Sequence, residues 1–162
     1  MLFLLGFIVY YFYPEYQLPD KAKIDAIVVY KSKHQLLAFF KGKLIKTYTI
    51  ALSKNSKGSK QYEGDQKTPE GVYYINDKNP NSGWHKNLGI SYPNHEDIKQ
   101  AKILGKRTGG DIKIHGLKNS RSYIGKFHRW RDWTLGCIAL TNEEIDELYD
   151  AVSLGCKIEI KP

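Results

Sequence analysis

The chain of 162 residues is poor in cysteine, with two, and contains one methionine and six prolines. It has no Cys-x-x-Cys pair and no His-x-x-x-His pair, so the ligand spacings typical of zinc sites are missing. Internal repeats and low-complexity segments are also missing, which excludes repeat architectures and gives no sign of a second folded domain. The sequence therefore predicts one folded domain that needs neither a metal ion nor another cofactor.

Nucleic-acid binding is also disfavoured, although lysines and arginines outnumber acidic residues by 25 to 17 and the net charge is +8. The basic residues are scattered along the chain, and no helix-turn-helix, zinc-finger or RNA-binding sheet motif accompanies them. Two interpretations remain. The charge is either a solvated basic surface or an attraction for an anionic polymer or membrane.

One apolar run stands out, at residues 2–13, and it is followed by Pro14 and a polar stretch. It is shorter than the roughly 20 residues that span a bilayer, lacks a basic leading segment, and has no small-x-small cleavage site after it. We interpret residues 1–19 as an anchor or signal-like segment, uncleaved or with a true start upstream, and residues 20–162 as the folded domain. The alternative is a first strand packed on the core.

Several runs rich in β-branched and aromatic residues are separated by short polar or glycine-containing segments, a pattern that predicts antiparallel strands. These runs are residues 25–30, 35–40, 44–52, 72–75 and 156–160. In the last run Cys156, Ile158 and Ile160 alternate with charged residues, so we expect Cys156 to be a core residue.

Two short helices are expected among these strands. Residues 96–104 can form the first, which ends at a glycine-rich region. The second starts at a capping box formed by Thr141 and Glu144, and apolar residues at helical spacing follow it. The predicted fold is therefore mostly β, a sandwich or open barrel with short helices.

The strongest chemical signal is a Thr-Leu-Gly-Cys run that ends at Cys137, with His115 in an Ile-His-Gly run 22 positions upstream. A thiol is a strong nucleophile only as thiolate, and a histidine beside it can take its proton. Glycine next to the nucleophile lets the backbone N–H groups of Gly136 and Cys137 approach a developing oxyanion. We expect both cysteines to be reduced, because a disulfide with Cys156 would block this nucleophile.

Four segments, in this order and spacing, resemble the L,D-transpeptidase catalytic domain. They are residues 64–71, 90–94, 114–116 and 132–139. The resemblance covers nearly all of the chain from residue 24 onward, and it implies that Cys137 is the nucleophile and His115 the base. It also implies that the backbone carbonyl of Gly116 orients the imidazole. Thr134 matches the family's Ser/Thr, and a hydrogen bond that holds the loop is its simplest role.

The chain departs from the family pattern at two positions. Leu135 stands where many members have a second histidine. A histidine at that position therefore cannot be the base in this chain. Ala139 stands where many members have an arginine suited to grip a substrate carboxylate. The candidates to replace that arginine are Arg129, Arg131 and Arg121, which lie between His115 and Cys137.

The segment before Cys137 is also rich in aromatic side chains and is expected to form a lid or pocket wall. We expect Trp133 to contact substrate, together with Tyr92 from the second matched segment. The other ring-bearing residues of the loop are Tyr123, Phe127, His128 and Trp130. The alternative for each of them is simple packing of a surface loop.

The resemblance implies an enzyme that acts on peptidoglycan stem peptides. Its expected reaction forms a thioester at Cys137, releases D-alanine and transfers the acyl group to an amine, which gives a 3→3 cross-link. The expected location is the periplasm or the outer face of the inner membrane, with membrane contact through residues 1–13, and the expected state is a monomer. An L,D-carboxypeptidase or wall amidase on the same fold is one alternative, and an inactive peptidoglycan-binding module is another. A redox thiol protein is a poorer third, because no resolving cysteine is near.

Overall fold

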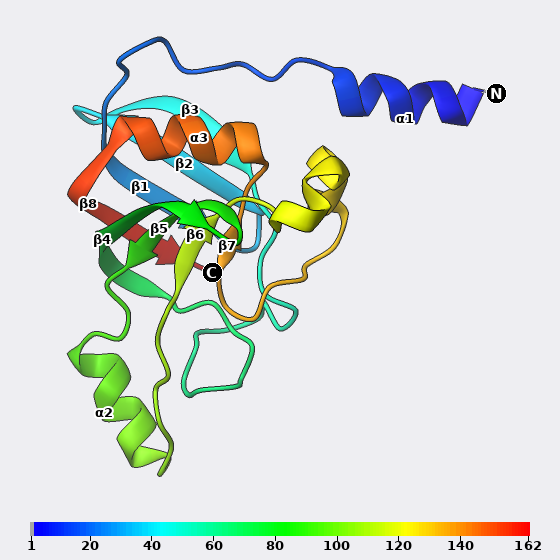
Figure 1. Ribbon diagram of the computed structural model, residues 1–162. Coiled ribbons are helices and arrows are strands. Elements are labelled where there is room, and N and C mark those ends of the chain that lie inside the picture. The colour runs from blue at the N-terminus through cyan, green and yellow to red at the C-terminus, as the bar shows by residue number, and fades with distance from the viewer. Residues whose placement is uncertain (1) are drawn as a thin grey trace.

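The computed structural model describes residues 2–162, and their side chains from residue 4 onward. Eight strands form its framework: β1 (Ile24–Tyr30), β2 (Gln35–Phe40), β3 (Lys43–Thr49), β4 (Gly71–Ser82), β5 (His85–Ile90), β6 (Lys113–His115), β7 (Ile138–Ala139) and β8 (Val152–Lys161). They belong to one sheet in the order β3-β2-β1-β8-β4-β5-β6-β7. The sheet curls into a half-barrel (Figure 1), so the mostly β expectation is confirmed in its open-barrel form.

The long strand β4 joins the two parts of this sheet. Its first half pairs with β8, which itself runs parallel to β1. Its second half pairs with β5, and the register shifts between Ile75 and Asp77 and again between Asn79 and Ser82. Such irregularities bend a strand and increase its twist. The bend carries the sheet round toward the short strands β6 and β7.

A single hydrophobic core follows the buried face of this sheet. Its fully buried side chains include Tyr48, Tyr73 and Ile27 from three different strands. Helix α3 (Asn142–Ala151) lies across the sheet and adds Ile145 and Leu148 to the core (Figure 1). The predicted capping box is present at its start.

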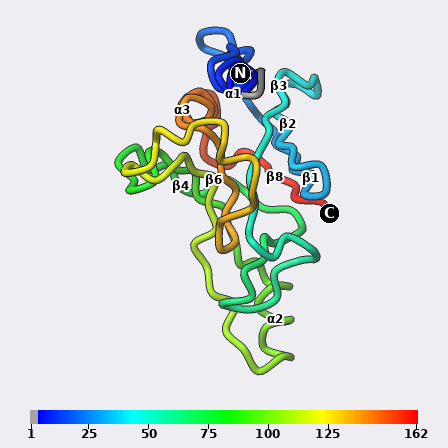
Figure 2. The backbone as a smooth tube through the Cα atoms, turned by 90° about the vertical axis from the view of Figure 1, so that its right-hand side faces the viewer, coloured from blue at the N-terminus to red at the C-terminus, as the bar shows by residue number. Residues whose placement is uncertain are grey.

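Helix α2 (His95–Ile103) projects from one end of the molecule (Figures 1 and 2). The Asn94 side chain caps it by accepting hydrogen bonds from the backbone N–H groups of Glu96 and Asp97. Only Ala101 of this helix is buried. The helix predicted at 96–104 is therefore confirmed, with each boundary displaced by one residue.

The apolar N-terminal run forms helix α1 (Leu2–Phe12), which lies at the end opposite α2 (Figures 1 and 2). The alternative of a first strand is therefore wrong. Helix α1 packs against η1 (Asn119–Trp130), a run of 3-10 turns that is interrupted at Arg121 and Gly125. No helix in residues 2–162 combines the length and the apolar character needed to cross a membrane.

Candidate functional site

Strand pairing brings Cys137 and His115 to one place. Strands β6 and β7 run parallel, with His115 opposite Ala139. Residues directly opposite each other point to the same face of a sheet, and Cys137 precedes Ala139 by two positions, which is one full period of a strand. Both side chains consequently line one cavity of about 390 Å³.

The His115 ring is fixed by its own neighbour. Its Nδ1 lies 2.7 Å from the carbonyl oxygen of Gly116. A carbonyl only accepts, so Nδ1 carries the hydrogen and Nε2 keeps its lone pair. Burial lowers the pKa of His115 below 6.5, opposed by the hydrogen bond to Gly116 and assisted by the charge of Lys113. The imidazole is therefore a neutral base with Nε2 as the basic atom.

Close packing explains why the residue after His115 is glycine. A Cβ at Gly116 would lie 2.8 Å from Asn142 Oδ1 and 3.0 Å from both His85 Cβ and Ile145 Cγ2. The backbone here is pressed against the first turn of α3. This contact fixes the carbonyl that orients His115.

The Cys137 thiol is protonated at rest. Burial raises its pKa above the ordinary value of 9.0, and the nearby Asp111 adds to this. The backbone N–H and the charge of Lys113 act in the opposite direction. The site thus pairs a neutral thiol with a neutral imidazole instead of holding a preformed thiolate and imidazolium.

Thr134 closes the turn that carries the cysteine. Its hydroxyl donates to the carbonyl of Cys137 at 2.7 Å and accepts from the N–H of Gly136 at 3.3 Å. Gly136 has φ +145°, and a Cβ there would lie 3.0 Å from Lys67 O. The Gly136 N–H, one of the two expected oxyanion donors, is thus engaged inside the loop.

Asp132 ties the same loop to the rest of the fold. Its carboxylate accepts from the backbone N–H of Leu52 at 2.8 Å and lies 3.0 Å from His34 Nε2. The next N–H groups, of Trp133 and Thr134, both donate to the carbonyl of Leu52. These bonds fix the position of the Trp133 ring.

Two tryptophans form a wall of the cavity beside His115. The rings of Trp84 and Trp133 stack with centroids 5.4 Å apart, and they lie 5.1 Å and 5.7 Å from the His115 ring. Trp133, which the sequence analysis expects to contact substrate, lines the cavity. Trp84 was missed, because it lies at the β4–β5 turn and nothing near it in the sequence points to residue 115.

Asn87 was missed as well. It lies opposite His115 in the β5–β6 pairing, lines the same cavity and is 3% exposed. Its Oδ1 has no hydrogen-bond partner among the described residues. The periodic alternation of a strand would place it on the His115 face, but the sequence does not reveal that β5 pairs with β6.

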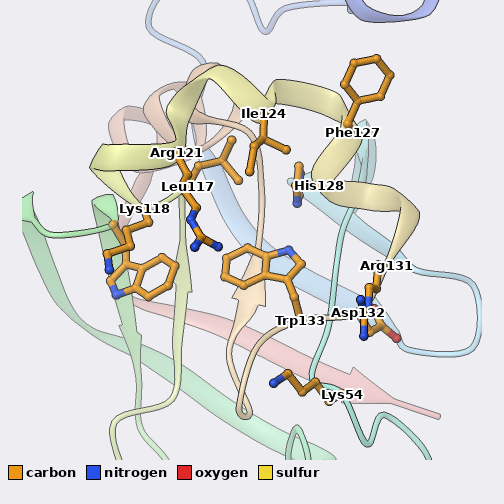
Figure 3. A pocket seen from close by; sticks show the side chains of 11 residues that line it. Lys54, Leu117, Lys118, Arg121, Ile124, Phe127, His128, Arg131, Asp132 and Trp133 are labelled. Carbon is orange, nitrogen blue, oxygen red and sulfur yellow. The ribbon is translucent and has the colours of Figure 1, made fainter. Parts of the chain in front are cut away.

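A second cavity, of about 510 Å³, lies under η1 (Figure 3). It shares Lys54, Trp84 and Trp133 with the cavity of Cys137. Arg131 and Arg121, two of the predicted replacements for the missing arginine, line it. The positions of these two side chains are thus compatible with a role in binding substrate.

The structure places two predicted contact residues elsewhere. Arg129 is held in ion pairs with Glu144 at 2.6 Å and Glu15 at 2.9 Å, and its side chain is 7% exposed. Tyr92 is a core residue whose hydroxyl donates to the carbonyl of Thr108 at 3.1 Å. Both side chains have partners within the fold, and neither lines the cavity of Cys137 or the cavity that contains Arg121.

The two departures from the family pattern also have defined places. Leu135 is 66% exposed and lines the cavity of Cys137. Ala139 is fully buried in β7, where it bridges to Ala51.

Both cysteines are free, and Cys156 is buried in β8, as expected for a core residue. Burial raises the pKa of Cys156 to about 11, which makes it a poor nucleophile. Within residues 2–162 no cluster of three or more His, Cys, Asp and Glu side chains could hold a metal ion.

Comparison with known proteins gives a family match for most of the chain. The family model of the L,D-transpeptidase catalytic domain, YkuD, matches residues 24–160. YafK of Escherichia coli strain K12, named as a candidate L,D-transpeptidase, is 31% identical over 112 residues, which are 68% of this chain and 38% of YafK. The chain therefore spans well under half the length of this relative.

Solved structures show the same fold. The helical cell shape determining protein Pgp2 of Campylobacter jejuni (K307A mutant) is 26% identical with a TM-score of 0.62, over 87% of this chain and 48% of Pgp2. An L,D-transpeptidase from Mycobacterium smegmatis is 13% identical with a TM-score of 0.58, over 87% of this chain and 59% of that one, and shows the fold alone. With the family model matching most of its length, the chain belongs to the L,D-transpeptidase catalytic domain (YkuD) family.

Proposed function

We propose that this protein is a cysteine-dependent L,D-transpeptidase that acts on peptidoglycan stem peptides. The observation that carries the proposal is the shared cavity of Cys137 and a neutral His115 whose Nδ1 is fixed by Gly116. Membership of the family and the likeness to a cell shape determining protein support the wall as the target.

In the first step His115 Nε2 takes the thiol proton while Sγ of Cys137 bonds to the carbonyl carbon that precedes the terminal D-alanine. The oxyanion that forms is stabilised by the backbone N–H of Cys137. The carbon–nitrogen bond then breaks, and the imidazolium returns its proton to the departing amine. A thioester and free D-alanine result.

In the second step an amine of a neighbouring stem attacks the thioester, with His115 taking the proton of the amine. The carbon–sulfur bond breaks, the amide forms, and the imidazolium protonates the thiolate. Water in place of the amine gives hydrolysis and a shortened stem. The competition depends on how well the acceptor excludes water from the cavity.

The cavity itself suits an anionic peptide. Lys54 and Lys113 line it, and its acidic side chain, Asp111, is paired with Lys113 at 2.7 Å. The unpartnered Oδ1 of buried Asn87 is available to accept a substrate amide N–H beside His115. Such a contact would align the scissile amide with the thiol.

An extracytoplasmic location follows from this substrate, since stem peptides are exposed there. We propose the periplasm, with attachment through the apolar face of α1. The described helix has 11 residues, fewer than the roughly 20 that span a bilayer, and we place it along the membrane surface.

The decisive experiment incubates the full chain with a defined disaccharide-tetrapeptide and resolves the products by mass spectrometry. We expect an acyl-enzyme on Cys137, loss of D-alanine and cross-linked dimers. Cys137→Ala should abolish all three, whereas Cys156→Ala, a matched change at the buried cysteine, should leave them in place. Unchanged substrate with the parent protein would contradict the proposal and favour a binding module.

Hydrolysis is the second candidate, because Leu135 and Ala139 replace residues that many members use around the nucleophile. The same experiment separates the two reactions. Tripeptide without dimer, in the presence of excess acceptor, would identify an L,D-carboxypeptidase. Cleavage only at another wall-linked amide would identify an amidase.

A further inference from the structure

The cavity under η1 has a marked excess of positive charge. Four cationic side chains line it, those of Lys54, Lys118, Arg121 and Arg131. Its acidic residue, Asp132, is already engaged by Leu52 N–H and His34. The ion pairs formed by arginines in the described part of the chain involve Arg107 and Arg129, so the guanidinium groups of Arg121 and Arg131 are available.

A buried histidine faces the same cavity. His128 is 5% exposed, and neither of its ring nitrogens has a hydrogen-bond partner within residues 2–162. The same holds for the indole nitrogen of Trp133. Figure 3 shows Arg121 and His128 reaching from η1 toward the Trp133 ring. Unpaired buried polar atoms are costly, so this group is suited to a ligand that supplies the missing partners.

The charge state of His128 narrows the chemistry of that ligand. Burial lowers its pKa to about 3, and the charge of Arg129 acts in the same direction. A neutral imidazole offers one N–H donor and one lone pair. The Trp133 indole adds a second donor, and Arg121 adds a charged one.

We infer that this cavity is a carboxylate-binding subsite that holds a free carboxylate of the stem peptide, with Arg121 as its charged partner and His128 and Trp133 as hydrogen-bond donors. The inference rests on the proposed function. Leu117, Ile124 and Phe127 form an apolar wall suited to the aliphatic part of the same residue.

The sign of the charge excludes the amine acceptor from this cavity. An ammonium group among four cationic side chains would be repelled, whereas a carboxylate is attracted. The two cavities share the wall formed by Trp84 and Trp133. One donor stem can therefore place its scissile carbonyl at Cys137 and a carboxylate beyond the tryptophans.

Binding to the full chain carrying Cys137→Ala tests this subsite without turnover. The probes are the tetrapeptide stem and a series in which one carboxylate at a time is replaced by a carboxamide. We expect one member of the series to bind about tenfold more weakly than the parent stem. That member identifies the carboxylate, whether it belongs to the terminal residue, the diamino acid or the glutamate.

The three tryptophans provide a local readout, because each indole N–H gives its own NMR signal. The parent stem should shift the signals of Trp133 and Trp84. The carboxamide that binds weakly should shift the Trp133 signal much less.

Arg121→Gln, added to Cys137→Ala, should remove the tenfold preference for the carboxylate. His128→Gln, which keeps a donor and an acceptor in a similar volume, should reduce it by less. The matched controls are Arg107→Gln, at a side chain 88% exposed far from the cavity, and His95→Gln at the start of α2. Both controls should retain the full preference.

The subsite is overturned if no carboxamide weakens binding, if Arg121→Gln keeps the preference, or if the stem does not bind. Failure of the proposed function has a separate signature. It is the absence of a Cys137 acyl-enzyme when the parent protein meets the same stem, whatever the binding preference of the cavity.

Discussion

At the scale of single residues, the protonation states of Cys137 and His115 determine how the site starts its reaction. Both groups are neutral at rest because burial raises the pKa of one and lowers the pKa of the other. A base that acts during attack does not need a preformed thiolate. The rate of alkylation by a reagent that requires the thiolate and the rate of turnover of a substrate that uses the base should consequently depend differently on pH.

We expect the alkylation rate of Cys137 by iodoacetamide to rise with pH and to have its midpoint above 9.0. Turnover of the stem peptide should instead persist below pH 6.5, because His115 is still neutral there. Rates measured from pH 5 to 10 in a Cys156→Ala background, which reports only Cys137, check both statements. An alkylation midpoint near pH 7 would indicate a preformed ion pair and would contradict this description.

The Gly116 backbone is the second residue-scale feature that can be tested. Gly116→Ala should reduce the free energy of unfolding by about 1–3 kcal/mol, because the new Cβ overlaps Asn142 and Ile145. It should also slow acylation of Cys137, since the displaced carbonyl orients His115. Urea denaturation and acyl-enzyme formation by mass spectrometry measure the two effects.

Gly110→Ala is the matched control for this change, because a Cβ at Gly110 has nothing within 4 Å. Its stability should be unchanged or slightly raised, and its acylation rate unchanged. Equal losses for the two variants would show that the contacts at Gly116 are not the cause.

At the scale of elements, the 3-10 segment η1 depends on a buried charge pair for its position. Arg129 near its end contacts Glu144 in the first turn of α3, and both side chains are 7% exposed. Glu144 also closes the capping box of that helix. The pair therefore fixes the roof of the second cavity to the helix that follows the nucleophile.

Arg129→Met should destabilise the protein by about 3–5 kcal/mol, because it leaves the Glu144 carboxylate buried without its partner. Arg107→Met is the matched control, at an arginine that lies 3.6 Å from Glu63 and is 88% exposed. Its effect should stay within about 0.5 kcal/mol. Urea denaturation compares them, and a loss below about 1 kcal/mol for Arg129→Met would show that Glu144 does not depend on this partner.

A single sequence reveals the local contacts of this site but not the contacts that depend on tertiary structure. Elements with a strong local period were predicted well: the meander β1 to β3, helix α2 and the capped helix α3. The sequence also indicated the turn around Cys137, because Thr134 and Gly136 form their contacts within a few residues of it. The partners of Arg129 were not readable, since Glu15 lies 114 positions away and only tertiary structure brings it near.

Other parts of the site share this limit. Trp84 and Asn87 face His115 only because β5 pairs with β6, and the short strands leave little local signal. The aromatic segment before Cys137 was expected as a lid or wall. The segment kinks at Gly125, where the absence of a Cβ leaves room for the ring of Tyr11. No local pattern in the sequence encodes that contact.

At the scale of the whole molecule, the apolar helix α1 has two different faces. Phe7, Tyr10 and Tyr11 pack against Phe127 and Trp130 of η1. From residue 4 onward, the apolar side chains of the helix that make no such contact have large exposed fractions, and they are Leu4, Leu5, Ile8, Val9 and Phe12. Exposed apolar patches of this kind are typical of membrane or protein contacts. The roof of the second cavity thus lies directly beneath a surface suited to lipid.

We expect the full chain to bind vesicles that contain anionic lipid, through these side chains and with help from its net charge of +8. Leu5→Glu with Ile8→Glu should weaken binding at least about tenfold in a vesicle sedimentation assay, since each buried aliphatic side chain contributes about 1.5–3 kcal/mol. Ile103→Glu with Leu104→Glu is the matched control, at exposed apolar residues where α2 ends, at the opposite end of the molecule (Figure 1). When α1 lies on the membrane, the end that carries α2 points away from it. The control should therefore bind vesicles as tightly as the parent. Equal loss in both double variants would instead mean that any exposed apolar pair contributes, and would remove the special role of α1.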